Sequence, residues 1–268
     1  GTMLFYLRGD GLKFCLSSTL ERWEFLPSAL HAAAGKGEWR SRVLEFLQRG
    51  FSVDAEIDGD TPLMRAASGG KLEAFRLLLK HGAAPSRAIE AAAIKGMEAV
   101  QLQRLLLEAG CDPQEMLSAT AARSAVDAVE VILQAGADVN QPDSKGRLAL
   151  SRACDNSIAM VRTLLAHGAD PSLGNEDGSH PLHYCAGLGF YHRLQVLLAA
   201  GAPVNLVEKS SGESALFAAC DEGKLACAKL LLDQGADPNL GCKSNTPLMA
   251  ACRYGSLALV ELLIERGA

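Results

Sequence analysis

The chain has 268 residues, of which 49% are hydrophobic and 21% are charged. This composition supports a sizeable buried core and excludes a disordered chain. The formal net charge is −5 at pH 7, which argues against nucleic acid or an anionic membrane as the main partner. No apolar run in the sequence reaches the roughly 18 residues that a membrane-spanning helix requires.

Residues 3–26 do not share the pattern of the rest of the chain. An apolar run at 4–7 and a second at 12–16 flank the dipeptide Asp10-Gly11. A turn signal of this kind between two apolar runs predicts a small β-hairpin. We expect residues 3–26 to form a hairpin or cap at the start of the following domain.

Residues 27–268 contain an internal repeat. A glycine closes each unit, at positions 50, 82, 110, 136, 168, 201, 235 and 267. An aliphatic residue opens an alanine-rich helix in each unit: Leu30, Leu63, Ile89, Leu117, Leu150, Leu182, Leu216 and Leu248. The period is about 33 residues, and self-similarity at such a period is typical of stacked-repeat solenoids.

Each unit predicts two consecutive helices. In the second unit, Thr61 can cap the first helix and Pro62 occupies its first turn, where a missing N–H costs nothing. The second helix carries an apolar stripe and ends at Gly82. Helices this short do not persist alone, so they must be stabilised by stacking on their neighbours.

The unit closely resembles the ankyrin repeat. The resemblance rests on Asp60-Thr61-Pro62-Leu63, on His180-Pro181-Leu182-His183, and on Gly136-Ala137-Asp138-Val139-Asn140. It implies an all-α repeat solenoid of about eight repeats over residues 27–268. It also implies that each repeat adds a short β-hairpin finger, and that fingers and first helices form a concave face.

Three departures from the repeat carry further predictions. The links between Gly82 and Ile89 and between Gly110 and Leu117 are about six residues shorter than the others. We therefore expect both links to lack a finger. The segment 98–107 has two extra residues and predicts a longer or bulged second helix in its unit.

The chain has eight cysteines, and several recur at equivalent places in the repeat, as Cys154, Cys220 and Cys252 do. Neighbouring helices pack about 8–10 Å apart, whereas a disulfide needs Cα atoms within about 7 Å. We therefore expect small buried thiols without bridges, which fits a reducing compartment such as the cytoplasm.

No catalytic motif stands out. The sequence has neither a phosphate-binding glycine loop nor a nucleophile elbow. His180, His183, Cys185 and His192 crowd one unit, but their spacing matches no zinc pattern. The resemblance gives His183 a structural role in hydrogen bonding between repeats. We expect no enzyme activity, no cofactor and no metal.

Partner-binding candidates are the finger tips and the ends of the first helices, which the family uses for specificity. Leu188, Phe190 and Tyr254 are large apolar side chains at positions expected to be exposed, although Phe190 could instead fold back onto the next repeat. Tyr191 aligns with Leu225 and Leu257 and is assigned to the core. The full set is Leu188, Phe190, Tyr254, Arg253, Asp221, Glu222, Glu213, Arg147, Lys145, Asp155 and Asp177.

These observations predict a monomeric, non-catalytic module that binds a protein partner on its concave face. An adaptor and an inhibitor or antidote remain open alternatives. Two others are the targeting part of a larger enzyme and a secreted bacterial effector that acts on a host protein. The partner is expected to be a protein, with no role for nucleic acid or a membrane.

Overall fold

The computed structural model of the protein describes residues 44, 48, 52–56, 59–94, 96–209, 211–242 and 245–268. The hairpin predicted at residues 3–26 lies outside these residues, and so does nearly all of the first predicted repeat. Both therefore stay predictions. In the described part of the chain, regular structure is helical, as the repeat pattern predicts.

Seven consecutive helix pairs follow one another in the described residues. The first helices of the pairs, called inner helices here, are α3 (Pro62–Ser68), α5 (Ile89–Ala92), α7 (Pro113–Arg123), α9 (Ala149–Cys154), α11 (Pro181–Gly187), α13 (Ala215–Asp221) and α15 (Pro247–Tyr254). The second, outer helices are α4 (Leu72–Lys80), α6 (Met97–Glu108), α8 (Val129–Gln134), α10 (Ile158–Ala166), α12 (Tyr191–Ala199), α14 (Leu225–Asp233) and α16 (Leu257–Glu265). Two short 3-10 helices, Pro85–Ala88 and Val126–Ala128, lead into α5 and α8.

The helices begin where the sequence provides caps. Thr61 and Thr246 each accept a hydrogen bond from the backbone N–H three residues later, and a proline follows each of them. Ser214 caps α13 in the same way. Because caps and proline satisfy the first turn locally, these starts are encoded within each unit.

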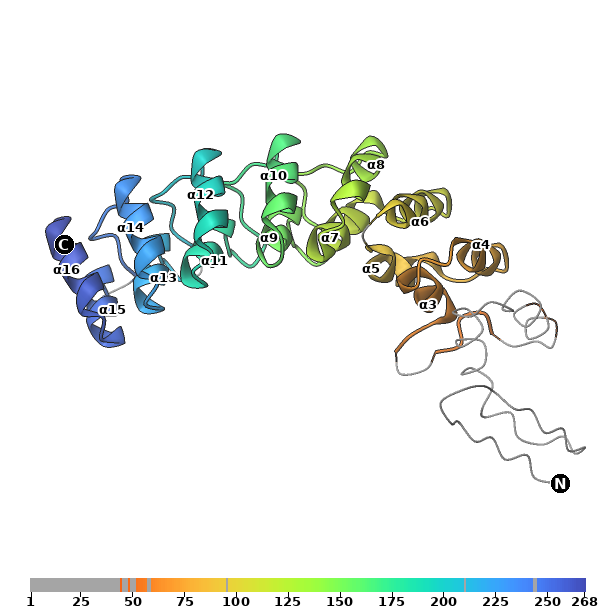
Figure 1. Ribbon diagram of the computed structural model, residues 1–268, viewed down its shortest axis with the longest axis horizontal. Helices are drawn as coiled ribbons and strands as arrows, with labels where there is room; N and C mark the ends of the chain where they lie inside the picture. Colours follow the sequence, from red (N-terminus) through yellow and green to blue (C-terminus); the bar gives the residue numbers. More distant parts are fainter. Residues whose placement is uncertain are drawn as a thin grey trace, which may run out of the picture.

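The pairs stack into an arc (Figure 1). Outer helices form the convex row and inner helices the concave row. Consecutive inner helices pack on each other, as α11 does on α13 and α13 on α15. The small residues of the inner helices, such as Ala186, Ala219 and Ala251, are buried and allow this close approach. The expected all-helical solenoid is thus confirmed.

The connections from each outer helix to the next inner helix show the predicted difference in length. After α4 and α6 the connections before the next helical turn are short, covering only 81–84 and 109–112. The connections after α8, α10, α12 and α14 are much longer and cover 135–148, 167–180, 200–214 and 234–246. The two predicted missing fingers are confirmed. The helix α6 has 12 residues whereas α10 has nine, which confirms the longer helix.

The fingers that are present are tight turns more than hairpins. Where both partners are described residues, β pairing is limited to two isolated bridges, Val207 with Ser214 and Cys242 with Asn245. Hydrogen bonds also tie successive repeats together: Asn140 donates to the carbonyl of Gly168, and Asn205 and Asn239 do the same to Gly235 and Gly267. The Gly-Ala-Asp segments are therefore structural.

One residue strains the backbone. Ser124, which ends α7, has φ of 60°, and it is the one non-glycine residue with positive φ in the described residues. A Cβ disfavours this left-handed conformation, which glycine adopts freely. Glycine has the opposing disadvantage of greater chain entropy when unfolded.

We expect Ser124→Gly to raise the free energy of unfolding by roughly 0.5–1 kcal/mol, measured by chemical denaturation. The matched control is Ser86→Gly, at a residue in the 3-10 helix where φ is not positive. At position 86 the backbone conformation suits any residue, so glycine relieves no strain there and should lower the free energy of unfolding. A loss of stability in both variants would contradict the strain argument.

Candidate partner-binding surface

Two apolar side chains are exposed at the C-terminal ends of inner helices, as predicted. Leu188 follows α11 and is 49% exposed, and Tyr254 ends α15 and is 56% exposed. Neither is needed to fill the core, which buried leucines and alanines of both helix rows already form. These two residues are therefore available to a partner.

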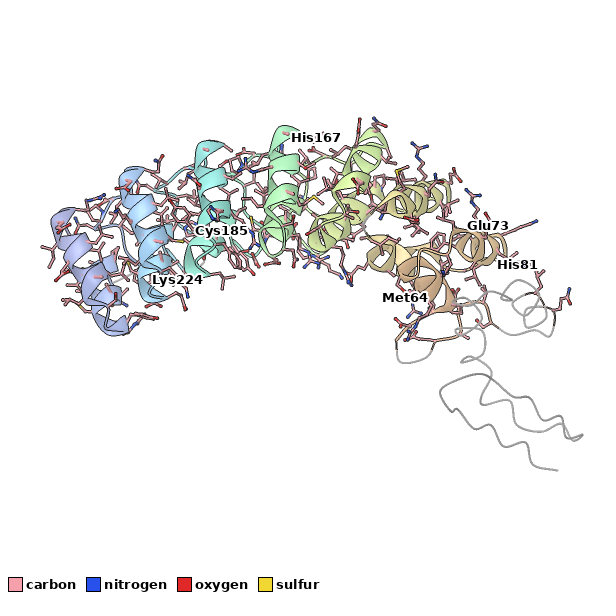
Figure 2. All side chains as sticks on the ribbon, in the orientation of Figure 1. Met64, Glu73, His81, His167, Cys185 and Lys224 are labelled. Atoms are coloured by element: carbon pink, nitrogen blue, oxygen red, sulfur yellow. The ribbon has the colours of Figure 1, made fainter. Side chains whose placement is uncertain are left out.

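The side chain of Lys224 joins them into one surface. The Lys224 side chain passes close to Gly189, the residue after Leu188. If Gly189 had a Cβ, that atom would lie 3.1–3.5 Å from the Lys224 side-chain carbons. The ring of Tyr254 covers Gly223 so closely that no Cβ would fit there. Leu188, Lys224 and Tyr254, which we call the inner-end strip, thus run across three repeats. Figure 2 shows Lys224 on the side of the inner helices.

Charged residues border the inner-end strip. Glu222 is exposed at the end of α13, in the repeat between Leu188 and Tyr254. Arg253 forms an ion pair with Asp221 that links α15 to α13. Because these two charges largely satisfy each other on an exposed surface, Glu222 and Lys224 are the charges more available to a partner.

The prediction that Phe190 is an exposed anchor is wrong. Its side chain is partly buried and packs against the core. The guanidinium of Arg193 lies over its ring, with Cζ 4.2 Å from the ring centroid, and the Tyr184 ring lies 6.2 Å away. Arg193 also donates to the carbonyl of Cys154 in the preceding repeat, at 2.9 Å. Phe190 therefore packs within its own repeat and supports Arg193, which bonds to the preceding repeat; these contacts are not the predicted alternative of packing on the next repeat.

The assignment of Tyr191 to the core is also wrong. Tyr191 and its equivalents Leu225 and Leu257 begin outer helices and are all exposed, Leu257 by 70%. Position in the repeat predicted burial because Leu72 lies there in an earlier unit. These three positions directly follow the short turn that joins the inner helix to the outer helix, and the structure leaves their side chains exposed there.

Asp155 has a local partner. It follows α9, and its carboxylate accepts a hydrogen bond from the Tyr184 hydroxyl of the next repeat. Burial, together with this hydrogen bond, raises the pKa of Tyr184 to about 12. Tyr184 is itself an exposed apolar ring on α11 that the sequence did not single out. The sequence feature that could have indicated Tyr184 is its aromatic ring, because the equivalent residues of the next two inner helices are the alanines Ala218 and Ala250.

The finger candidates form a separate group. Lys145, Arg147, Asp177 and Glu213 precede inner helices, whereas Leu188 and Tyr254 end them. An inner helix of about seven residues is about 10 Å long, so the two groups lie about that far apart along the helix row. The eleven predicted residues are thus not brought into one patch.

Most finger candidates are held by contacts within the finger or with the preceding inner helix. The Arg147 guanidinium pairs with the fully buried Asp143 carboxylate at 2.7 Å. Burial of the Asp143 carboxyl opposes its ionisation, but hydrogen bonds from Arg147, Ser118 and Lys145 together outweigh burial and lower its pKa to about 2. Asp177 accepts from the backbone and hydroxyl of Ser179, and these bonds lower the pKa of Asp177. Lys145, in contrast, is exposed and can contact a partner.

His183 has the predicted structural bond between repeats. Its Nε2 lies 2.9 Å from the carbonyl oxygen of Glu213 in the next finger. The half-buried Glu213 is therefore tied to the fold through its backbone. His180, His183 and Glu208 also place one potential metal-ligating atom each within 4.8 Å of one another.

The cysteines in the described residues are free thiols, as predicted, and five of them are buried, but Cys252 is exposed, so its predicted burial is wrong. Burial raises the pKa of Cys220 to about 12 and the pKa values of Cys111 and Cys227 to about 11. The hydrogen bond with Cys154, together with burial, raises the pKa of Cys185 as well. Figure 2 places Cys185 between the two helix rows. Since the thiolate is the reactive form, these four thiols are poor nucleophiles.

Of the helices in the described residues, none has the length and apolar character needed to cross a membrane.

Known proteins share the repeat. A family model described as ankyrin repeats in three copies matches residues 10–89, 88–175, 116–206 and 182–268. The Ankyrin repeat protein nuc-2 of Neurospora crassa is 30% identical over 249 residues, covering 89% of this chain and 21% of that protein. The human Ankyrin repeat and MYND domain-containing protein 1 is 30% identical over 261 residues, covering 82% of this chain and 28% of that protein.

A shorter relative is matched over most of its own length. The human Cyclin-dependent kinase 4 inhibitor B is 35% identical over 101 residues, which cover 37% of this chain and 73% of that protein. This chain thus spans less than a third of the two long relatives and most of the short one. Ankyrin repeats are protein-interaction modules. From the helix-pair stack and these matches together, the chain belongs to the ankyrin-repeat family.

Proposed function

We propose that this chain is a non-catalytic module that binds a protein partner on its concave side, through the inner-end strip. The observation that supports this most is the strip itself. Leu188, Lys224 and Tyr254 run across three repeats and present apolar surface that the core does not use. Large apolar groups at the centre of an interface contribute most of its binding energy.

The surroundings of the strip indicate the chemistry of the partner. An apolar anchor would lie between Leu188 and Tyr254, with a basic group facing Glu222 and an acidic group near Lys224. On the fingers, before the inner helices begin, Lys145 and Asp177 present a second pair of charges. The partner would therefore lie along the inner helices. Because the helices are already ordered, binding costs little conformational entropy.

A catalytic role has less support. An open depression of about 630 Å³ lies between α10 and α12 on the convex side, lined by Arg162 and uncharged residues such as Leu165, Gln195 and Val196. That lining offers no acid and base pair for chemistry. Because the described thiols are free, we propose a reducing compartment such as the cytoplasm.

The relatives leave adaptor and inhibitor both open. One relative is named as an inhibitor of a cyclin-dependent kinase, which favours inhibition by complex formation as one outcome. The two longer relatives extend well beyond the region matched by this chain, which favours an alternative in which the repeats direct the rest of a larger protein. Both roles would use the same strip.

The test is capture of partners from source lysate by the native chain and by Leu188→Glu with Tyr254→Glu. Phe190 is left intact because its side chain supports the fold. The matched control is Met97→Glu, which also places a charge at an exposed apolar position but at the start of α6, outside the strip. Circular dichroism checks that all three proteins fold.

We expect a protein that the native chain and the control retain and that the double variant loses. Its affinity, measured by calorimetry, should fall at least about 30-fold in the double variant, as expected for loss of two anchors. Equal affinity of the double variant and the native chain would place the interface elsewhere.

A further inference from the structure

A cluster of three potential metal ligands joins two repeats. His180 precedes α11, His183 lies within its first turn, and Glu208 belongs to the finger before α13. One ligating atom from each lies within 4.8 Å of the other two. The sequence did not indicate the cluster because Glu208 comes from the next unit, and Cys185 and His192, which crowd the histidines in sequence, are not part of it.

His183 is oriented in the way that metal-bound histidines are. Its Nε2 lies 2.9 Å from the Glu213 carbonyl oxygen, and a carbonyl can only accept, so Nε2 carries the hydrogen. Nδ1 of the neutral ring then holds a lone pair. This atom is buried and has no hydrogen-bond partner. A histidine that ligates a metal typically donates its other N–H to a carbonyl or carboxylate, which sets the ring orientation.

His180 offers a second buried nitrogen. The residue is 8% exposed, and its Nδ1 also lacks a hydrogen-bond partner. Its ring packs on Gly174 of the preceding finger, where an added Cβ would lie 2.8 Å from Cε1 and Nε2. The absence of a side chain at Gly174 thus makes room for this ring position. Two buried ring nitrogens without partners are unfavourable unless something binds them.

Glu208 supplies the negative charge. It is half-buried, and its carboxylate accepts a hydrogen bond from the Ser211 hydroxyl at 3.2 Å. Backbone bonds from Glu208 to Glu213 and from Gly212 to Glu208 hold the surrounding turn. A carboxylate with one such neighbour retains lone pairs for a cation.

We propose that His180, His183 and Glu208 bind a divalent cation of the zinc class, which clasps the start of α11 to the next finger. Two histidines and a glutamate are a known zinc ligand set, with water in the fourth position. Imidazole nitrogen favours Zn²⁺ over Ca²⁺ or Mg²⁺. Tetrahedral ligand atoms lie about 3.3 Å apart, so the three atoms close by up to about 1.5 Å on binding.

The test is calorimetric titration of the chelator-treated chain with Zn²⁺, using three variants. Glu208→Gln keeps the size of the side chain and removes its charge. His180→Gln removes one nitrogen ligand. His192→Gln is the matched control, because His192 is an exposed histidine in the same repeat and lies outside the cluster. Thermal unfolding with and without Zn²⁺ gives a second readout.

We expect the native chain and the control to bind one Zn²⁺ at this site and to gain thermal stability from it. Affinity should fall at least tenfold in Glu208→Gln and in His180→Gln. Substitution by Co²⁺ should give the visible bands of a tetrahedral site without a thiolate charge-transfer band.

Equal Zn²⁺ affinity in native, Glu208→Gln and His180→Gln chains would overturn the proposal, and so would no binding at all. A thiolate band with Co²⁺ would also overturn it, because cysteines would then be the ligands. Circular dichroism checks that both variants keep the native spectrum. If His180→Gln does not fold, the result of Glu208→Gln alone tests the proposal, because Glu208 is only half-buried and its replacement is less disruptive. Partner capture through the inner-end strip is a separate measurement, so either proposal can fail alone.

Discussion

Leu164→Ala is expected to lower the free energy of unfolding by about 3 kcal/mol. Leu164 lies in α10 and is fully buried in the core. Its removal leaves a cavity that short, stacked helices cannot easily collapse to fill. Because each repeat is stabilised mainly by its neighbours, the loss should weaken the stacking of α10 against α12 as well.

The matched control is Leu165→Ala, one residue further along α10. Leu165 is only partly buried and lines the open depression on the convex side. The same change in side-chain size should cost about 1 kcal/mol or less there. Urea denaturation followed by circular dichroism measures both variants. Equal losses of unfolding free energy in Leu164→Ala and Leu165→Ala would contradict the burial of Leu164 on the core face of α10.

Asp143→Ala is expected to lower the free energy of unfolding by about 3 kcal/mol. The Asp143 carboxylate accepts from the Ser118 hydroxyl at 2.6 Å, from the backbone N–H groups of Lys145 and Arg147, and from the Arg147 side chain. Its removal leaves these donors without an acceptor in a buried site. The finger would lose its link to α7, which carries Ser118.

Asp177→Ala is the matched control for this change. Asp177 lies in the finger that follows the finger of Asp143. Each of these two carboxylates accepts from the backbone N–H two residues later, but Asp177 is exposed. Water can replace its hydrogen bonds, so the loss should stay within about 1 kcal/mol. Similar losses in both variants would show that burial of Asp143 adds nothing.

The same carboxylate predicts a dependence on pH. The pKa of Asp143 is about 2 in the folded chain, below the value of about 3.9 expected when unfolded. Its stabilisation is therefore fully present above about pH 4 and is lost as pH falls toward 2, amounting to roughly 2 kcal/mol. Denaturation curves across this pH window should show that loss in the native chain and a smaller one in Asp143→Ala.

Features that depend on a single repeat could be predicted from the sequence. Thr61-Pro62 and Thr246-Pro247 mark helix starts, because capping satisfies backbone groups within a few residues. The short links after Gly82 and Gly110 revealed the missing fingers, because a finger needs residues to build it. Leu188 and Tyr254 were correctly expected to be exposed, because the C-terminal ends of the inner helices are not needed to hold the stack.

Contacts between repeats became known only from the folded stack. Arg193, which covers Phe190, donates to the carbonyl of Cys154 in the preceding repeat, and Asp143 accepts from Ser118 of the preceding unit. Lys224 joins the inner-end strip because it crosses Gly189 of another repeat, and Glu208 reaches His180 and His183 from the next finger. Periodicity and capping act over a few residues, so they predict each unit. Contacts between units depend on which side chain of the adjacent repeat comes to lie there, and only stacking determines that.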